Sequence, residues 1–273
     1  GSADQLGIVA ASGMITSNVG LVEIPHLIAP AGLADLAAAI QAVPLADVCP
    51  LPIHFIPGIK NSSGVSDLSQ LEQMDIMRGE EVESCAIIKS RHRGTPMLLV
   101  LPGSHTKFVA VDASGMISGC LTTISGELLS CVTNNTIIAD AVGRSFVEAE
   151  TYDRDMTLLG YDIAKKCGVG RACFSGRILN QFVTKDTKKA ANFILGAALQ
   201  NDILAIRNSS AVRADALTTI IVAGKDPFRQ AFTDILNHEG AFGKVDTFIP
   251  EEGIPLSALG VIAVMEKGGL LPT

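Results

Sequence analysis

The fold is decided by Leu98-Leu-Val-Leu-Pro-Gly-Ser-His-Thr-Lys-Phe-Val-Ala-Val111, in which a polar turn separates two apolar runs. Each run has the length and apolar character of a buried strand, and a Pro-Gly pair is typical of a turn. A third apolar run, 116–121, follows the turn Asp112-Ala-Ser-Gly115. The sequence therefore predicts three consecutive strands with a polar loop between the first two.

That loop, residues 103–107, carries a glycine, two hydroxyls, an imidazole and a lysine. Turn amides that form a concave nest bind phosphate oxygens, and a lysine adds a positive charge. We therefore interpret the loop as a candidate phosphate cradle. Two alternatives stay open: an ordinary hairpin turn that faces water, and a hydrolase pair of Ser104 with His105, for which no orienting acid is identified.

Four segments of the chain resemble the 2-keto-3-deoxy-galactonate kinases (2-dehydro-3-deoxygalactonokinases), a family of the sugar kinase, Hsp70 and actin superfold. The segments are Ala11-Ser-Gly-Met-Ile-Thr-Ser-Asn-Val-Gly20, Met77-Arg-Gly-Glu-Glu81, Leu101-Pro-Gly-Ser-His-Thr-Lys-Phe108 and Ser125-Gly-Glu-Leu128. Weaker similarities are Phe174-Ser-Gly-Arg177 and Val222-Ala-Gly224. The resemblance implies a two-lobed α/β protein with the actin-like ATPase (ribonuclease H-like) fold, with ATP and Mg²⁺ as cofactors.

The resemblance also implies where the nucleotide binds. The phosphates would contact Gly103, Ser104, His105, Thr106 and Lys107. Gly224, at the end of the apolar run 218–223, would lie against the adenosine, since a glycine lets the backbone approach the purine. Many members of the superfold have an acidic residue before the loop glycine, whereas this chain has Pro102, as the galactonate-kinase family does. The metal ligands are therefore left unassigned, with Mg²⁺ held mainly by phosphates.

Glu80 and Glu81 are the candidate catalytic residues, because phosphoryl transfer to an alcohol needs an acidic group near the attacking hydroxyl. They follow Arg78 and Gly79 at the predicted start of a helix over 80–91. In this interpretation, backbone N–H groups and the arginine would attract the carboxylate of the acceptor, while one Glu would accept the hydroxyl proton. The alternative is that acidic residues in a first helical turn only complement the helix dipole.

The candidate ligands of the sugar acid are polar residues in the matched segments: Ser12, Thr16, Ser17, Asn18, Arg78, Glu127 and Arg177. The first four follow the first predicted strand, and ligands collect at strand ends in open α/β sheets. Their alternative is ordinary turn chemistry. Glu127 is equally suited to satisfying the start of a helix, and Arg177 to a surface position.

The rest of the chain divides near residues 94–96. We predict that residues 95–273 form a C-terminal lobe, which carries the phosphate loop and the adenosine side. Residues 3–94 are predicted to form a partial N-terminal lobe on the sugar-acid side. The C-terminal lobe continues with a helical region 127–166, helices 188–206, 227–238 and 256–267, and strands 218–223 and 245–249. The N-terminal part predicts strands 6–11 and 53–56 and helices 33–43 and 80–91.

The family's first lobe begins with a strand-loop-strand unit whose Asp-x-Gly-type loop helps to hold ATP phosphates and metal. No segment of this chain matches that unit. We therefore expect the first lobe to be incomplete, with its opening strands and first helix missing, which leaves the catalytic competence of the chain open.

Composition excludes several partners. The net charge of −7 provides no basic face for nucleic acid or an anionic membrane, and no apolar run reaches the roughly 20 residues of a membrane span. The six cysteines form no Cys-x-x-Cys pair, which favours reduced thiols in a cytoplasmic protein. The sequence does not fix the oligomer, and a homodimer stays open.

The sequence thus predicts an ATP-dependent kinase of 2-keto-3-deoxy-D-galactonate that forms the 6-phosphate in galactonate catabolism. Its partner would be a small sugar acid. The main alternative is a non-catalytic sugar-acid-binding or regulatory protein of the same superfold. A phosphohydrolase is a further alternative, but it would need a water-activating acid beside the phosphate loop.

Overall fold

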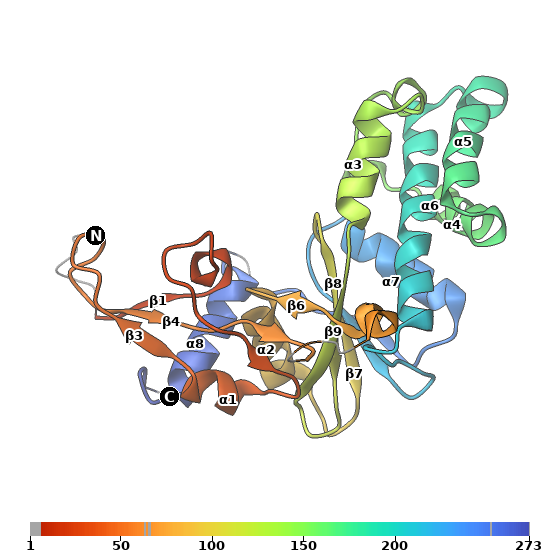
Figure 1. Cartoon of the computed structure of the whole chain (residues 1–273). Helices are drawn as coiled ribbons and strands as arrows, with labels where there is room; N and C mark the ends of the chain where they lie inside the picture. Colours follow the sequence, from red (N-terminus) through yellow and green to blue (C-terminus); the bar gives the residue numbers. More distant parts are fainter. Residues whose placement is uncertain (1–6, 63, 65–66, 252, 273) are drawn as a thin grey trace. The chain divides into compact units, whose positions relative to one another are not determined.

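The computed structural model describes residues 7–62, 64, 67–251 and 253–272. It contains one five-stranded sheet and two three-stranded sheets (Figure 1). The chain divides into two compact units. Unit 1 comprises the chain up to Met97, Val109–Leu121 and the chain from Pro250 onward, and unit 2 comprises Leu98–Phe108 and Thr122–Ile249.

The five-stranded sheet has the order β11-β10-β7-β8-β9. Its members are β7 (Met97–Leu101), β8 (Thr106–Val111), β9 (Ile117–Thr123), β10 (Thr219–Val222) and β11 (Val245–Thr247). The three consecutive strands predicted from the sequence are confirmed, and every residue of β7 and β8 is buried. This burial explains why both strands read as continuous apolar runs rather than as alternating ones.

Unit 1 contains both small sheets. In the first, with the order β1-β4-β3, β1 (Val9–Ala11) runs parallel to β4 (Ile53–Phe55), and β3 (Gln41–Val43) runs antiparallel to β4. In the second, β5 (Ile59–Lys60) pairs with β2 (Leu27–Ile28) in parallel and with β6 (Ile76–Met77) antiparallel. Leu6, where the first strand was predicted to begin, lies outside the described residues.

The helix predicted over residues 33–43 is wrong in its second half. Helix α1 (Leu33–Ala38) ends after six residues. Residues 41–43 instead form β3, where Gln41 lies opposite Phe55 and Val43 opposite Ile53. Pairing with a neighbouring strand satisfies these backbone groups and overrides the local helical preference.

The other two helices of unit 1 have the predicted bounds. They are α2 (Glu80–Arg91) and α8 (Leu256–Lys267), and α8 packs against both α1 and α2. A Cβ on Gly260 would lie 1.8 Å from Val82 O, so the absence of a side chain allows α8 to approach α2 closely. This packing places α8 in unit 1, whereas the sequence placed it in the second lobe.

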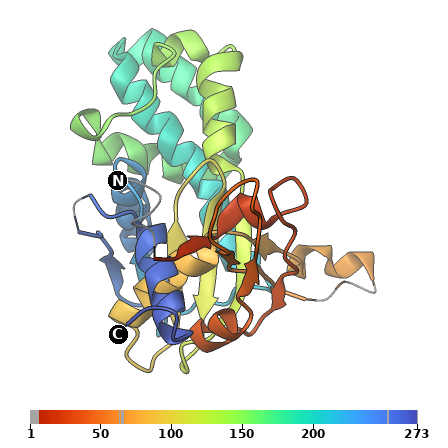
Figure 2. The same cartoon turned by 90° about the vertical axis from the view of Figure 1, so that its left-hand side faces the viewer.

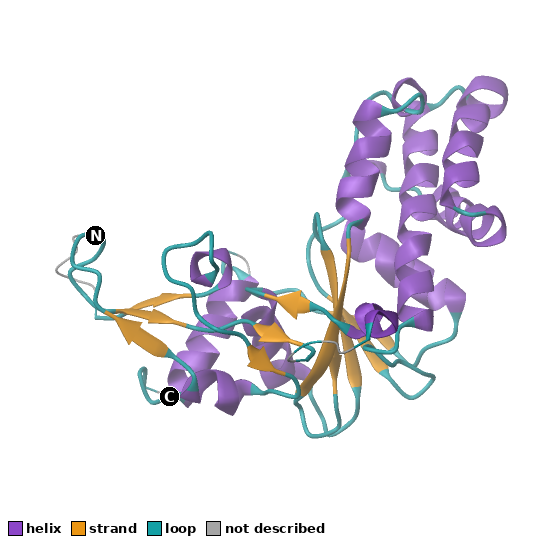
Figure 3. Ribbon diagram, viewed as in Figure 1, coloured by secondary structure: helices purple, strands orange, loops and turns teal. Residues whose placement is uncertain are grey.

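Unit 2 carries most of the helices: α3 (Ser125–Asn135), α4 (Arg154–Cys167), α5 (Val169–Leu179), α6 (Thr187–Asn208) and α7 (Phe228–Glu239). Helices α3 to α6 lie side by side (Figures 2 and 3). The helical region predicted over 127–166 is interrupted after Asn135, where the backbone of Thr136 is extended and its hydroxyl donates to Val132 O. Helix α5 was not predicted.

Short helical turns complete the fold. They are η2 (Gly13–Thr16), η3 (Leu68–Gln73), η4 (Ala139–Val142), η5 (Ala149–Thr151) and the π-helical η6 (Asn180–Thr184). Within the described residues, every helix is too short or too polar to cross a membrane.

Helices α4 and α6 are in contact at two glycines. A Cβ on Gly160 would lie 1.9 Å from Phe193 O, and one on Gly196 would lie 1.8 Å from Thr157 O. The carboxylate of Glu239 from α7 accepts hydrogen bonds from Tyr161 and Lys165 of α4. It also pairs with Arg207 of α6. The framework of unit 2 therefore rests on close backbone approach and one buried carboxylate.

Gly160→Ala is expected to lower the free energy of unfolding by about 1–3 kcal/mol, because the new methyl group overpacks the α4–α6 contact. Gly170→Ala in α5 is the matched control, since a Cβ there meets no atom within 4 Å. The control should be neutral or stabilising by about 0.5–1 kcal/mol. Urea unfolding measures both; equal stability of the two variants would contradict the glycine contact.

Candidate active site

The predicted phosphate loop spans the connection between β7 and β8. Gly103, Ser104 and His105 form the exposed turn, whereas Thr106 and Lys107 are buried and already belong to β8. The strand thus begins two residues earlier than the sequence indicated. Successive side chains of a strand point to opposite faces, so Thr106 and Lys107 leave the loop in opposite directions.

The first turn of α3 holds this loop in place. A Cβ on Gly126 would lie 2.3 Å from Gly103 O, and Glu127 N donates to Ser104 O at 3.2 Å. The Glu127 carboxylate also pairs with His105 Nε2 at 2.7 Å. A glycine-containing turn is therefore docked on a helix N-terminus, and both elements favour anions through their N–H groups.

The buried end of the loop is fixed by hydroxyl groups. Lys107 is 5% exposed, and its ammonium group donates to the Thr122 hydroxyl. The hydroxyls of Thr106 and Ser125 are 2.9 Å apart. These contacts join the start of β8 to the end of β9 and the start of α3, so they fix the direction in which the loop amides point.

Gly224 lies beside the same loop. It follows β10 with φ +86°, and a Cβ on it would lie 3.2 Å from Pro102 Cδ. Ala223 N donates to Val100 O at 2.9 Å, which holds the two segments together. The structure therefore brings together the predicted phosphate residues 103–107, Glu127 and Gly224.

Arg177 is not part of this group. Its guanidinium donates to Ile137 O at 2.8 Å, beyond the C-terminal end of α3. The loop contacts the other end of α3, and eleven helical residues span about 16 Å. In the structure Arg177 ties helix α5 to the connection after α3.

A second group of predicted residues assembles within unit 1. Gly13 and Gly79 both have positive φ, +82° and +116°, and a Cβ on Gly79 would lie 3.4 Å from Gly13 Cα. Two segments about sixty residues apart in the sequence, 12–18 and 77–81, therefore meet backbone to backbone. Glycine is required here because only it combines this conformation with this approach.

Arg78 organises the first of these segments. Its guanidinium donates to the backbone carbonyl and hydroxyl of Thr16, to Ile24 O at 3.1 Å and to His26 Nδ1 at 3.1 Å. Burial and the charges of Arg78 and Lys60 lower the pKa of His26 to about 4, so its ring is neutral at pH 7. The guanidinium of Arg78 is thus hydrogen-bonded to the loop 16–26. Binding of a sugar-acid carboxylate by Arg78 stays a prediction.

Two of the hydroxyl groups that follow β1 form hydrogen bonds within their own loop. Thr16 Oγ1 donates to Gly13 O at 2.9 Å and Ser17 Oγ donates to Met14 O at 2.7 Å. Asn18 is exposed and Ser12 is half-buried. Of the four, only Asn18 and Ser12 therefore present side chains that these turn contacts do not use.

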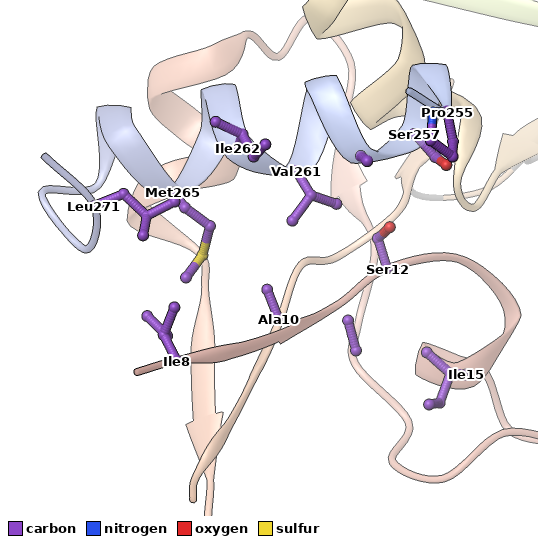
Figure 4. A pocket seen from close by; sticks show the side chains of 12 residues that line it. Ile8, Ala10, Ser12, Ile15, Pro255, Ser257, Val261, Ile262, Met265 and Leu271 are labelled. Carbon is purple, nitrogen blue, oxygen red and sulfur yellow. The ribbon is translucent and has the colours of Figure 1, made fainter. Parts of the chain in front are cut away.

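Ser12 borders a groove of about 690 Å³ in unit 1 (Figure 4). The groove is lined by β1 and α8, and its other side chains include Ile8, Val261 and Met265. Ser12 and Ser257 supply hydroxyls at one end. The lining is mainly apolar, which suits a hydrocarbon group better than the hydroxyls of a sugar acid.

Glu80 and Glu81 occupy different environments at the start of α2. Glu80 is half-buried and accepts from Arg78 N at 3.0 Å. Glu81 is fully buried and accepts from Gly79 N at 2.7 Å, while its Oε1 has no hydrogen-bond partner in the described structure. Burial raises the pKa of Glu81 to about 8, so at pH 7 this side chain is mainly a neutral acid.

A family model described as 2-keto-3-deoxy-galactonokinase matches residues 2–247 of the chain. The chain belongs to this family. It is 30% identical over 141 residues to a probable 2-dehydro-3-deoxygalactonokinase of Rhizobium meliloti (strain 1021), covering 51% of this chain and 40% of that protein. It is 32% identical over 130 residues to the 2-dehydro-3-deoxygalactonokinase of Escherichia coli (strain K12), covering 48% and 39%.

These matches span about two fifths of the length of each curated relative. The fold is similar to that of a putative 2-dehydro-3-deoxygalactonokinase from Sinorhizobium meliloti, with a TM-score of 0.72 and 19% identity over 97% of this chain and 81% of that one. The family assignment made from the four sequence segments is therefore confirmed.

One buried acid of this galactonokinase-family chain was missed by the sequence reasoning. Asp202 lies on α6, is 0% exposed, and is close to the hydroxyls of Thr123 and Ser125. Burial raises its pKa to about 7, and the two hydroxyls oppose that shift. The available signal was a single acidic residue on the apolar face of an otherwise uncharged helical stretch, 190–206.

Glu81→Gln is expected to flatten the pH dependence of stability. The folded-state pKa of about 8 lies above the ordinary value of 4.5, so the stabilisation by the bound proton is complete below pH 4.5 and is lost as the pH rises through 8. Glutamine is uncharged at every pH and keeps the shape of the protonated acid.

Urea unfolding at pH 5, 6, 7 and 8 measures this effect. We expect the variant to gain stability relative to the wild type across this window, by up to a few kcal/mol in total. Glu80→Gln is the comparison: the Glu80 charge helps to raise the pKa of Glu81, so this variant should lose less of the pH dependence than Glu81→Gln does. A Glu81→Gln profile parallel to the wild type would show that Glu81 is ionised at neutral pH.

Proposed function

We propose that this chain carries out the ATP-dependent phosphorylation of 2-keto-3-deoxy-D-galactonate to its 6-phosphate, in galactonate catabolism, on an actin-like ATPase fold. The observation that carries the proposal is the loop 103–107, docked on the first turn of α3 with a buried lysine at its base. The family membership supports the substrate class, and the use of ATP supports a cytoplasmic location.

The loop supplies what a phosphate chain requires. The turn at Gly103 and Ser104 leaves no side chain larger than a hydroxymethyl group between the backbone and a ligand. N–H groups of the loop and of the α3 start would donate to phosphate oxygens, and Lys107 would add a fixed positive charge. Gly224, which has positive φ and lies against Pro102, would contact the adenosine part of the nucleotide through its backbone.

The residues present suit a metal that arrives with the nucleotide. The described residues contain no group of three or more His, Cys, Asp or Glu side chains placed to hold an ion. Mg²⁺ that keeps several water ligands and is held mainly by substrate phosphates needs no such group. When bound, it would neutralise charge on the transferred phosphate.

We assign the general base to Glu80 rather than Glu81. A base must come within hydrogen-bond reach of the proton that it accepts. Glu80 is half-buried and so accessible to a ligand, whereas Glu81 is fully buried and mainly protonated at neutral pH. Of the residues after β1, the exposed Asn18 is the best placed to bind hydroxyls of the sugar acid, because Ser12 borders the mainly apolar groove.

The test is ADP release from ATP, Mg²⁺ and 2-keto-3-deoxy-D-galactonate, with direct titration of the protein by Mg·ADP in parallel. The wild type should bind Mg·ADP and release ADP only when the sugar acid is present. Lys107→Met should weaken Mg·ADP binding at least tenfold, since it removes a charge from the phosphate loop. Lys244→Met, at an exposed position of the same unit, is the control.

The same assay tests the base. Glu80→Gln should lose turnover while the KM of the sugar acid changes little. Binding of the sugar acid without nucleotide binding or turnover would favour the non-catalytic alternative. Unchanged Mg·ADP affinity in Lys107→Met would contradict the assignment of the loop.

A further inference from the structure

The carboxyl group of Asp202 is the most unusual buried group of unit 2. The residue is 0% exposed, and neither carboxyl oxygen has a hydrogen bond of standard geometry within the described structure. A buried carboxyl without partners is costly, so such a group is retained only where neighbouring donors can turn towards it. Two hydroxyls are near enough to do so.

These hydroxyls belong to Thr123 and Ser125, at the end of β9 and the start of α3. Thr123 Oγ1 and Ser125 Oγ are 3.3 Å apart, and Ser125 Oγ is 2.9 Å from Thr106 Oγ1. A continuous series of side-chain contacts therefore leads from Asp202 through Ser125 to Thr106, which is the first residue of β8 and part of the loop 103–107.

The chemistry of these groups determines which one donates and which one accepts in each hydrogen bond. An ionised carboxylate only accepts hydrogen bonds, whereas each hydroxyl donates one proton. If Ser125 donates to Asp202, Thr106 must donate to Ser125, and both hydroxyls are then held in one orientation. This orientation fixes the start of β8 relative to the first turn of α3, the two elements that carry the loop amides.

We propose that Asp202 is a positioning residue for nucleotide binding, which acts through Ser125 and Thr106 to hold the phosphate loop against the first turn of α3. The inference rests on the proposed function of that loop. Asp202 itself does not contact the nucleotide, because it is fully buried on the far side of the hydroxyl chain. Its effect is to keep the N–H groups of the loop in the orientation in which they donate to the nucleotide phosphates.

Asp202→Asn separates this role from a purely structural one. The amide has the same shape, but it carries no negative charge, only one of its two ends accepts, and its NH₂ end can only donate. Asparagine therefore no longer offers both hydroxyls a charged acceptor. Removing a buried charge should leave the free energy of unfolding at pH 7.5 equal to that of the wild type or higher. The Kd for Mg·ADP should nevertheless rise about tenfold, because the loop N–H groups are no longer held in the orientation that binds phosphate.

A double-mutant cycle with Ser125→Ala shows whether the effect passes through Ser125. In the Ser125→Ala background, Asp202→Asn should change the Kd for Mg·ADP less than twofold. Ile203→Val, at the next buried position of α6, is the control for packing and should leave the Kd unchanged.

The outcomes separate this inference from the proposed function. A wild-type protein that binds no Mg·ADP overturns both. Wild-type binding together with an unchanged Kd in Asp202→Asn, or with additive effects of the two substitutions, overturns the positioning role alone. A Kd that rises only as far as stability falls would also contradict it, because that pattern reports a structural residue.

Discussion

The proposed phosphate loop, residues 103–107, depends on one contact, the docking of its backbone on the first turn of α3. Gly126 has no room for a Cβ against Gly103 O, so the loop and the helix start are held as one piece of backbone. Hydroxyls and a lysine beneath the loop then fix the start of β8. A phosphate site built from backbone N–H groups requires this rigidity, because those groups cannot turn individually towards a ligand.

Unit 1 has a similar arrangement of close glycine contacts and a cationic side chain, in this case around Arg78. Gly13 and Gly79 allow two segments that are distant in the sequence to meet. Beside them, the guanidinium of Arg78 donates hydrogen bonds to carbonyl and hydroxyl groups of the loop 16–26. The arginine at the start of α2 thus shapes the loop that follows β1. In both units, glycine allows the close backbone approach and a cationic side chain, buried Lys107 or half-buried Arg78, binds the neighbouring polar groups.

The sequence predicted the strands around residues 98–111 and the exact bounds of α2 and α8, because their apolar patterns and turn residues are strong local signals. It could not predict that residues 41–43 pair with β4 or that α5 forms, since these depend on distant partners. Nor could it distinguish Glu80 from Glu81: the two are neighbours in sequence, and only tertiary packing buries one of them. Asp202 had a signal in the sequence, a lone acid in an uncharged helical stretch, but its nearness to Thr123 and Ser125 depends on tertiary packing.

Hydrogen–deuterium exchange with and without Mg·ADP tests the central claim most directly, because it reports on the backbone amides that the account assigns to phosphate binding. The account predicts slower exchange in residues 102–107 and 125–128 when Mg·ADP is bound, with little change in the segment 257–265 along the apolar groove. Protection in other segments, with unchanged exchange in 102–107, would contradict it.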